Sequence, residues 1–446
     1  MNNYKVEDAQ GAAVQIEVAA ERVDEKPDIA ALKLDKHGFP LVPQPSEHKM
    51  DPLNWSTWLK MTILIQISAI SFLSLLAASL IVSPLSSVRP SIYRSYFQQT
   101  PAFQPLSLFL HRSLVQTAYV TSLFILCTGL SPLIWNPIAN VYGRRPVYIL
   151  TLVLAVATSG ASGGAPDFSS LLALRALNGL GAGAPGGLGS ATVCDLFFQH
   201  ERGLYMGIFT VALISGGHIA PVIGGYIEKN LEWQWCFYVP SIIGGALLVI
   251  IILCLPETLY PRSSEALAMP QRSWRQNMMM LGGKVHPNRN LKLVDFIRPL
   301  QMLKYPSVLF PALYYSVSFG YGSILFILTA ANLFGSIYHY KPFQTGLLLG
   351  LPLTIGSLLG ELLSGGFSDW VRYKRAKATE SIGRPEDRLL ALIPALIITP
   401  VGIIIEGVCL QHKTHWIGPA MGIGLASFGL QVATTVIYAY TCEVCV

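Results

Sequence analysis

Two short runs of charged and small residues interrupt the apolar parts of the sequence at similar places. The first run contains Asn140, Gly143, Arg144 and Arg145, and the two arginines directly follow the glycine. Guanidinium groups at a helix end can anchor that end at a membrane surface, and they can also bond the exposed carbonyls of a neighbouring helix. Either role places this run at the inner surface of a membrane.

The second run, around Asp369 and Arg372, follows a later apolar segment in the same way. Anchoring at the membrane surface explains either run alone. A repeat at the same point of two series of apolar segments is harder to obtain by chance, and it predicts a chain built from two similar halves. Asp369 and Arg372 therefore join the first run as candidate functional residues.

Two charged residues lie inside long apolar segments, where a charge is expensive. Arg175 is expected about two helical turns from the end of its segment, so it is a functional candidate unless its side chain reaches the interface. Glu361 can serve as a proton or cation site, or it can bond a neighbouring helix. Both explanations stay open for each residue.

One apolar segment carries glycines and a proline at steps of 9, 5, 3 and 1 residues: Gly207, Gly216, Pro221, Gly224 and Gly225. Glycines at such steps let helices approach closely, and a proline removes a backbone donor and bends the helix. Ordinary helix packing explains the glycines but not their full spacing. The pattern predicts a hinge.

Aromatic residues form a stripe on a later segment at Tyr314, Tyr315 and Phe319. Such a stripe suits flat or cationic substrates, although ordinary packing is the simpler explanation. His218 lies within the glycine pattern and could titrate, but a packed or outward-facing histidine is the simpler expectation. Cys442 and Cys445 have no second cysteine pair or nearby histidine, so no metal site is expected.

Composition decides which elements position these residues. The chain has 446 residues, of which 52% are hydrophobic and only 13% charged, whereas soluble chains carry about 25% charged residues. Continuous apolar runs near the length of a bilayer-crossing helix predict an all-α polytopic membrane protein. The predicted spans are 61–83, 115–138, 147–164, 168–195, 204–227, 236–256, 307–332, 344–367, 389–409 and 417–441.

The basic residues lie mostly in alternate loops, which places both termini in the cytosol by the positive-inside rule and gives no signal for nucleic acid. The expected organisation is a disordered cytosolic tail (1–58), a six-span half (59–256), a cytosolic central loop (257–306) and a four-span half (307–446). Two equal halves would need twelve spans, so about ten are present of an expected twelve, and a truncated product is one hypothesis. The stretch 88–112 is expected either as an outer cap or as an insertion.

These patterns resemble the signatures of the major facilitator superfamily. The run 136–146 resembles the first signature, with Asn140 in place of its aspartate, and 175–183 resembles the second, with Asn178 in place of its glutamine. The spacing in 207–225 is similar to the antiporter signature of the family. Shorter matches at 51–60, 195–203 and 256–258 resemble the fungal drug:proton antiporter branch.

The resemblance implies a two-half helical bundle that moves small organic molecules by alternating access, through proton-coupled antiport. It implies proton coupling for Arg175, an exchanger hinge in 207–225, and a latch between the halves. Glu361 is a further candidate for proton coupling because it is an acid inside an apolar segment. The latch residues would be Asn140, Gly143, Arg144, Arg145, Asp369 and Arg372.

A transporter of this kind is no enzyme and needs no cofactor or metal. The expected partners are a small-molecule substrate, protons and the lipid bilayer, and the expected state is a monomer. The plasma membrane is favoured over the vacuole. The alternatives are a nutrient facilitator or symporter, or a truncated product that binds but does not transport.

Overall fold

The structure is a computed structural model of the whole chain. It describes residues 33 and 41 and the ranges 43–80, 114–198, 201–260, 273–279, 290–340, 342–379 and 385–444. These residues form helices and no strands, in agreement with the predicted all-α fold. Most of the predicted tail 1–58 and the whole stretch 88–112 lie outside the described residues.

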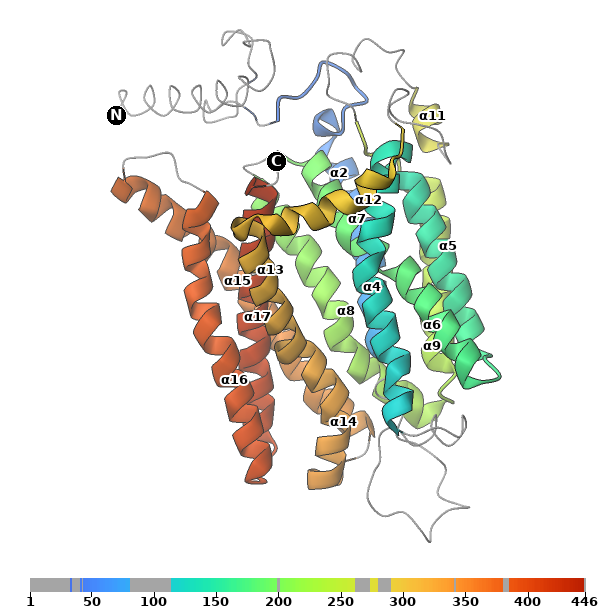
Figure 1. Cartoon of the computed structure of the whole chain (residues 1–446), viewed down its shortest axis with the longest axis vertical. Coiled ribbons are helices and arrows are strands. Elements are labelled where there is room, and N and C mark those ends of the chain that lie inside the picture. The colour runs from blue at the N-terminus through green and yellow to red at the C-terminus, as the bar shows by residue number, and fades with distance from the viewer. Residues whose placement is uncertain are drawn as a thin grey trace.

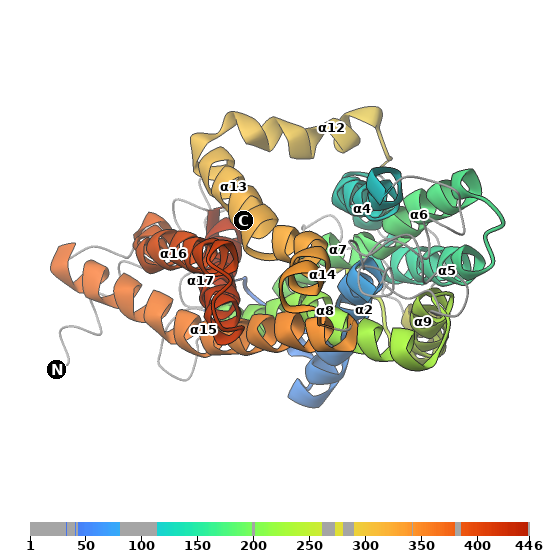
Figure 2. The ribbon, with the colours of Figure 1, turned by 90° about the horizontal axis from the view of Figure 1, so that it is seen from below.

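The helices form two groups that stand side by side, both in the side view of Figure 1 and in the end-on view of Figure 2. The first group contains α2 (Thr57–Ser79), α4 (Leu114–Tyr142), α5 (Arg144–Gly163), α6 (Phe168–Ala182), α7 (Ala184–Leu196), α8 (Arg202–Asn230) and α9 (Trp235–Cys254). The second group contains α13 (Pro306–Phe319), the π-helix η6 (Gly320–Ile324), α14 (Leu325–Tyr338), α15 (Pro342–Thr379), α16 (Ile393–Gln411) and α17 (Ile417–Val444).

Short helices accompany the two groups. They are η2 (Pro52–Asn54), α11 (Trp274–Met278), α12 (Leu293–Gln301), η5 (Met302–Lys304) and η7 (Pro385–Leu392). Of these, α12 lies in the chain between the first and the second group, and in Figure 1 it runs across the upper end of the molecule. It is the main described element of the predicted central loop.

Nine helices within the described residues are long and apolar enough to cross a membrane. The difference from the ten predicted spans lies in 168–195, which is not one helix but the pair α6 and α7, separated at Gly183. A Cβ on Gly183 would overlap the carbonyl oxygen of Thr128 on α4, and Pro185 in the first turn of α7 has no N–H to continue the α6 ladder. The fourth predicted span is therefore a broken helix, which the length of an apolar run cannot reveal.

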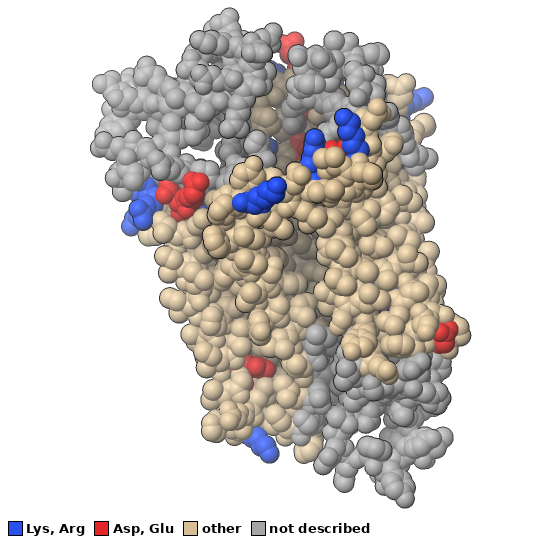
Figure 3. Space-filling model, viewed as in Figure 1, with Lys and Arg blue, Asp and Glu red and all other residues tan. Residues whose placement is uncertain are grey.

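The middle of the molecule suits a bilayer. On the face drawn in Figure 3, most of the charged side chains lie near the upper end, and a broad band of uncharged residues covers the middle. Large apolar side chains of the spanning helices are exposed, such as Ile242 of α9 at 63% and Leu362 of α15 at 78%. Such exposure is costly in water and favourable in lipid.

The two groups meet along α8 and α15, which pack on each other. Their backbones touch directly, because a Cβ on Gly346 of α15 would overlap the carbonyl oxygen of Pro221 on α8. On another face, α8 packs equally closely on α2, where a Cβ on Gly216 would overlap the carbonyl oxygen of Phe72. Helix α8 is thus held between its own group and the other one by contacts that need glycine.

Candidate functional site

The first charged run lies where α4 ends and α5 begins. Gly143 has a φ of 102°, a left-handed conformation that side chains with a Cβ rarely adopt, so this turn requires glycine. The backbone N–H groups of Arg144 and Arg145 follow this turn and open α5. As the first residues of a helix, they have no acceptor within it.

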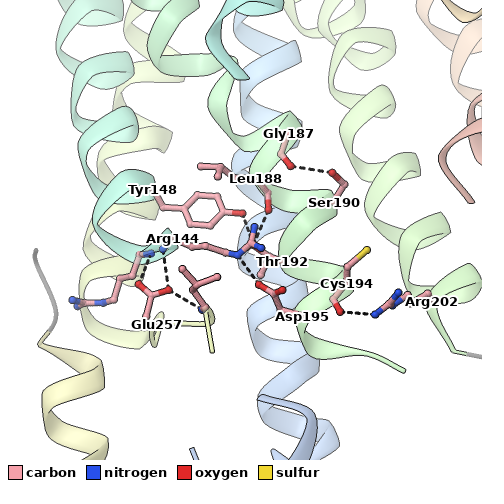
Figure 4. Close-up of polar contacts among 12 residues, drawn as sticks. Arg144, Tyr148, Gly187, Leu188, Ser190, Thr192, Cys194, Asp195, Arg202 and Glu257 are labelled. Carbon is pink, nitrogen blue, oxygen red and sulfur yellow. Dashed lines mark hydrogen bonds and ion pairs between the residues drawn. The ribbon is translucent and has the colours of Figure 1, made fainter. Parts of the chain in front are cut away.

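Glu257 supplies those acceptors (Figure 4). Its Oε1 accepts hydrogen bonds from the backbone N–H of Arg144 at 2.9 Å and of Leu259 at 2.8 Å, and its Oε2 accepts from the N–H of Arg145 at 3.0 Å. A carboxylate is favoured at the positive end of a helix dipole. Burial raises the pKa of the Glu257 carboxyl, and these N–H bonds oppose that shift.

The arginine side chains join two further helices to this point. Arg145 donates from Nε to the carbonyl of Leu255 at 2.6 Å and from Nη2 to that of Ile252 at 2.7 Å, so it caps the end of α9. Nε of Arg144 lies 2.5 Å from Oδ2 of Asp195, near the end of α7. The α5–α7–α9 cluster, made of Arg144, Arg145, Asp195 and Glu257, holds one end of the first helix group together.

The remaining predicted latch residues lie elsewhere. Asn140 is exposed near the end of α4, outside this cluster. Asp369 and Arg372 belong to α15, but their side chains lie outside the described residues. The described contacts of the predicted latch are therefore internal to the first group, and a role between the groups stays a prediction.

Arg175 is enclosed in the first group, with 1% of its surface exposed. Its guanidinium carbon lies 4.1 Å from the ring centroid of Phe124 and 5.7 Å from that of Phe237. Nη1 donates to Oδ1 of Asn178 at 3.2 Å, whereas Nε and Nη2 have no hydrogen-bond partner among the described residues. Contact with two ring faces offsets part of the cost of burying this charge.

Glu361 lies at the contact between the two groups. It belongs to α15, and its Oε1 occupies the position where a side chain on Gly207 of α8 would be. Its Oε2 accepts hydrogen bonds from Nε2 of Gln431 at 2.8 Å and from the hydroxyl of Thr435, both on α17. The carboxylate thus touches α8, α15 and α17, and its described hydrogen-bond partners are uncharged.

The other residues of the predicted hinge also lie in α8. Gly216 faces α2 and Pro221 faces α15, and Gly224 and Gly225 are buried. Helix α8 continues through Pro221 from Arg202 to Asn230. Gly207 and Pro221 therefore contact α15 of the second group, whereas Gly216 contacts α2 of the first group.

A cavity of about 290 Å³ lies between the two groups. Phe124 and His218 line it from the first group, and Phe319 and Ser323 line it from the second. Nδ1 of His218 is 3.3 Å from the hydroxyl of Ser357, and its Nε2 is 3.4 Å from that of Ser323. The histidine therefore bridges α8 to both α15 and the π-helix η6, at a helix irregularity of the kind often found at functional sites.

The aromatic stripe is divided between two environments. Phe319 lines the cavity, and Tyr315 stacks on it at 5.8 Å between ring centroids. Tyr314 and Tyr315 themselves pack against buried residues of α17 and η7, and they are not part of the cavity wall. Of the three predicted substrate residues, only Phe319 is placed to touch a bound molecule.

Several of these partners were not recognised as functional in the sequence. Asp195 and Glu257 contribute there only to the resemblance, since 113 positions separate Glu257 from Arg144 and no spacing rule relates them. Gln431 and Thr435 carry no motif at all. Among the described residues, no group of three or more His, Cys, Asp or Glu could hold a metal ion.

Comparison with known proteins indicates a family of membrane transporters, which agrees with the helical fold described above. The model of the Major Facilitator Superfamily matches residues 67–445. The crystal structure of a bacterial homolog to the human lysosomal transporter Spinster, in an inward-facing and unoccupied conformation, aligns with a TM-score of 0.53 and 17% sequence identity, over 86% of this chain and 80% of that one. At that identity, the likeness shows the fold.

Sequence relatives are fungal transporters. An MFS-type transporter, atr4, from Stereocaulon alpinum is 29% identical over 88% of this chain and 67% of its own length. An MFS transporter, fsa7, from a Fusarium species is 31% identical over 87% of this chain and 72% of its own. A probable efflux pump, mfs2, from Aspergillus flavus is 24% identical over 77% of this chain and 82% of its own.

The fold and the charged contacts define a polytopic helical membrane protein with two bundles around an intervening cavity. The chain belongs to the Major Facilitator Superfamily. Its function is membrane transport, as that of its relatives is.

Proposed function

We propose that this transporter exports small organic molecules in exchange for protons. The observation that carries the proposal is the position of Glu361, an acid at the contact of the two groups that touches Gly207 of the predicted exchanger hinge. A relative that is named an efflux pump supports the direction of transport. The working unit is a monomer in the plasma membrane, with both termini in the cytosol.

Protonation of Glu361 changes the contact between α8 and α15. The ionised carboxylate only accepts hydrogen bonds, and it accepts them from Gln431 and Thr435. Protonation removes the charge, so the bonds that Oε2 accepts are no longer charge-assisted, and the Oε1 side, which faces Gly207, can carry an O–H donor. Because the same carboxylate rests on Gly207, proton binding alters the relative free energies of two arrangements of the groups, which is what coupling requires.

The cavity is the proposed substrate site. Its wall is largely apolar, with the rings of Phe124 and Phe319 on opposite groups and His218 and Ser323 as polar points. A volume of about 290 Å³ accommodates a small organic molecule, and apolar walls with a few polar groups are typical of such sites. The guanidinium of Arg175 lies against the ring of Phe124, one side chain away from the cavity.

The test is flux in proteoliposomes that contain the full chain under an imposed pH gradient, with ethidium as a flat, fluorescent organic cation. The parent protein should move ethidium against the direction of proton flow. Glu361→Gln should reduce the effect of the gradient at least about tenfold, as expected when a group needed for a proton step is removed. Glu406→Gln is the matched control, because Glu406 is a buried acid on α16 outside this contact.

Other outcomes separate the alternatives. Ethidium flux that is indifferent to the gradient would contradict proton coupling and leave a facilitator. Flux in the direction of the protons would indicate a symporter, and binding of ethidium without flux would indicate a product that does not transport.

A second variant tests the contact between the Glu361 carboxylate and Gly207. In Gly207→Ala the new Cβ would displace the Glu361 carboxylate, which is the movable end of a side chain, so the fold should persist while gradient dependence falls. Gly245→Ala on α9 is the control, because a Cβ there meets nothing within 4 Å. Unchanged gradient dependence in Gly207→Ala would contradict a role for the contact between Glu361 and Gly207.

A further inference from the structure

Helix α12 differs in direction from the spanning helices. It comprises Leu293–Gln301, and it runs across the upper end of the molecule in Figure 1 and along its side in Figure 2, between α4 and the start of α13. It contacts α4 and continues through η5 into α13. The chain that connects the two groups thus lies across the bundle end at this point.

One face of α12 is apolar and uncovered. Leu293, Ile297 and Leu300 recur at the i, i+4 and i+7 positions of one helical stripe, and they are 84%, 52% and 49% exposed. Val294 beside them is 51% exposed. None of the residues of α12 is buried, so the described parts of the chain do not cover this stripe.

The opposite face is polar and stabilises the helix locally. Oδ2 of Asp295 accepts a hydrogen bond from the backbone N–H of Lys292 at 3.0 Å, which caps the helix start. Oδ1 of Asp295 lies 3.1 Å from Nη1 of Arg298. A helix of nine residues is nevertheless marginal in water, since isolated helices shorter than about 12 residues rarely persist. It needs a surface for its apolar stripe.

The basic residues favour one kind of surface. Lys292, Arg298 and Lys304 lie on or beside α12, against the single acid Asp295. Membrane-surface helices combine an apolar stripe with lysine or arginine on the polar side, and anionic phospholipids strengthen their binding.

The end of α15 gives an independent sign of a membrane boundary. Trp370 is 50% exposed there, and Nζ of Lys374 lies 4.1 Å from the centroid of its ring. Tryptophan and lysine together are typical of the interface between lipid and water. In Figure 1 this end of α15 lies, like α12, in the upper part of the molecule.

We propose that α12 is a lipid-binding helix that lies in the headgroup layer of the cytosolic leaflet and recruits anionic phospholipids through Lys292, Arg298 and Lys304. Its apolar stripe enters the boundary of the acyl chains, and its basic side chains reach the phosphates. Each basic residue near an anionic leaflet strengthens such binding about fivefold. The leaflet then holds the linker that joins the two helix groups.

Spin labels on the full chain in lipid vesicles test the proposal. The seven native cysteines are replaced by alanine, and the fold of this background is checked by its thermal unfolding. Ile297→Cys and Arg298→Cys then carry the label on neighbouring positions that point about 100° apart. The ratio of collisions with oxygen, which enters lipid, to collisions with a water-soluble nickel chelate should be several-fold higher at 297 than at 298.

The role of the basic residues is tested in the protein labelled at position 297. Adding phosphatidylserine to phosphatidylcholine vesicles should deepen the label at 297, and the combined Lys292→Gln and Lys304→Gln changes should remove this effect. Equal nickel access at both positions would overturn the proposal. It would also be overturned by shielding of position 297 from both reagents, which indicates a protein cover such as a second copy, or by indifference to phosphatidylserine.

Discussion

Glu257 shows at the residue scale how one carboxylate can secure a helix start. Its two oxygens accept three backbone N–H bonds, including those that open α5. Glu257→Gln keeps the shape but presents an amide NH₂ group to backbone donors. Because charge-assisted bonds are lost and a buried donor is left facing another donor, we expect the free energy of unfolding to fall by about 1–3 kcal/mol.

Thermal or denaturant unfolding of the purified protein in detergent measures this change. Asn140→Ala is the matched control, since Asn140 belongs to the same turn region but is exposed, and exposed substitutions typically change stability by less than about 0.5 kcal/mol. Equal losses in the two variants would contradict the role assigned to Glu257.

The break between α6 and α7 is the clearest feature at the element scale. Gly183→Ala would place a Cβ against the carbonyl of Thr128 on α4, and backbone cannot yield as a flexible side chain can. Overpacking of this kind costs about 1–3 kcal/mol, so the variant should unfold at a lower temperature. Gly186→Ala, three positions further on, meets nothing within 4 Å and should unfold at or slightly above the parent temperature.

Elements were predictable from the sequence to the extent that they depend on local composition. The apolar runs predicted the spanning helices, because a helix that faces lipid must be apolar along its length. The division at Gly183 depends on a carbonyl of Thr128, and the π-helix η6 lies opposite His218. Such contacts between distant segments leave no local periodicity to detect.

The candidate site divides in the same way. Gly143, Arg144 and Arg145 were found because their types and spacing form a recognisable turn. The pairing of Glu361 with Gly207, and the place of Phe319 on the cavity wall, follow only from how the helix groups meet. Tyr314 and Tyr315 were predicted with Phe319 because a sequence stripe does not indicate which of its residues face a cavity.

At the scale of the whole molecule, the orientation of the helix bundle across the membrane can be predicted. The loop around Lys413 joins α16 to α17, whereas the ends of α4 and α15 carry the arginine runs. The positive-inside rule predicts that the arginine-rich ends face the cytosol. A small epitope inserted after Lys413 should therefore bind antibody on intact cells.

The corresponding control is an epitope at the N-terminus, which should bind antibody only after the cells are permeabilised. Surface staining of the N-terminal epitope on intact cells would contradict the proposed orientation.

The glycine contacts of α8 have a mechanical consequence. Where Gly216 meets Phe72 and Gly346 meets Pro221, at least one partner contributes no side chain. A sliding displacement at these points therefore changes no rotamer of the glycine and carries little loss of side-chain entropy. Resistance to relative movement of the two groups is therefore expected from the polar contacts between them, such as those of His218 with Ser357 and Ser323.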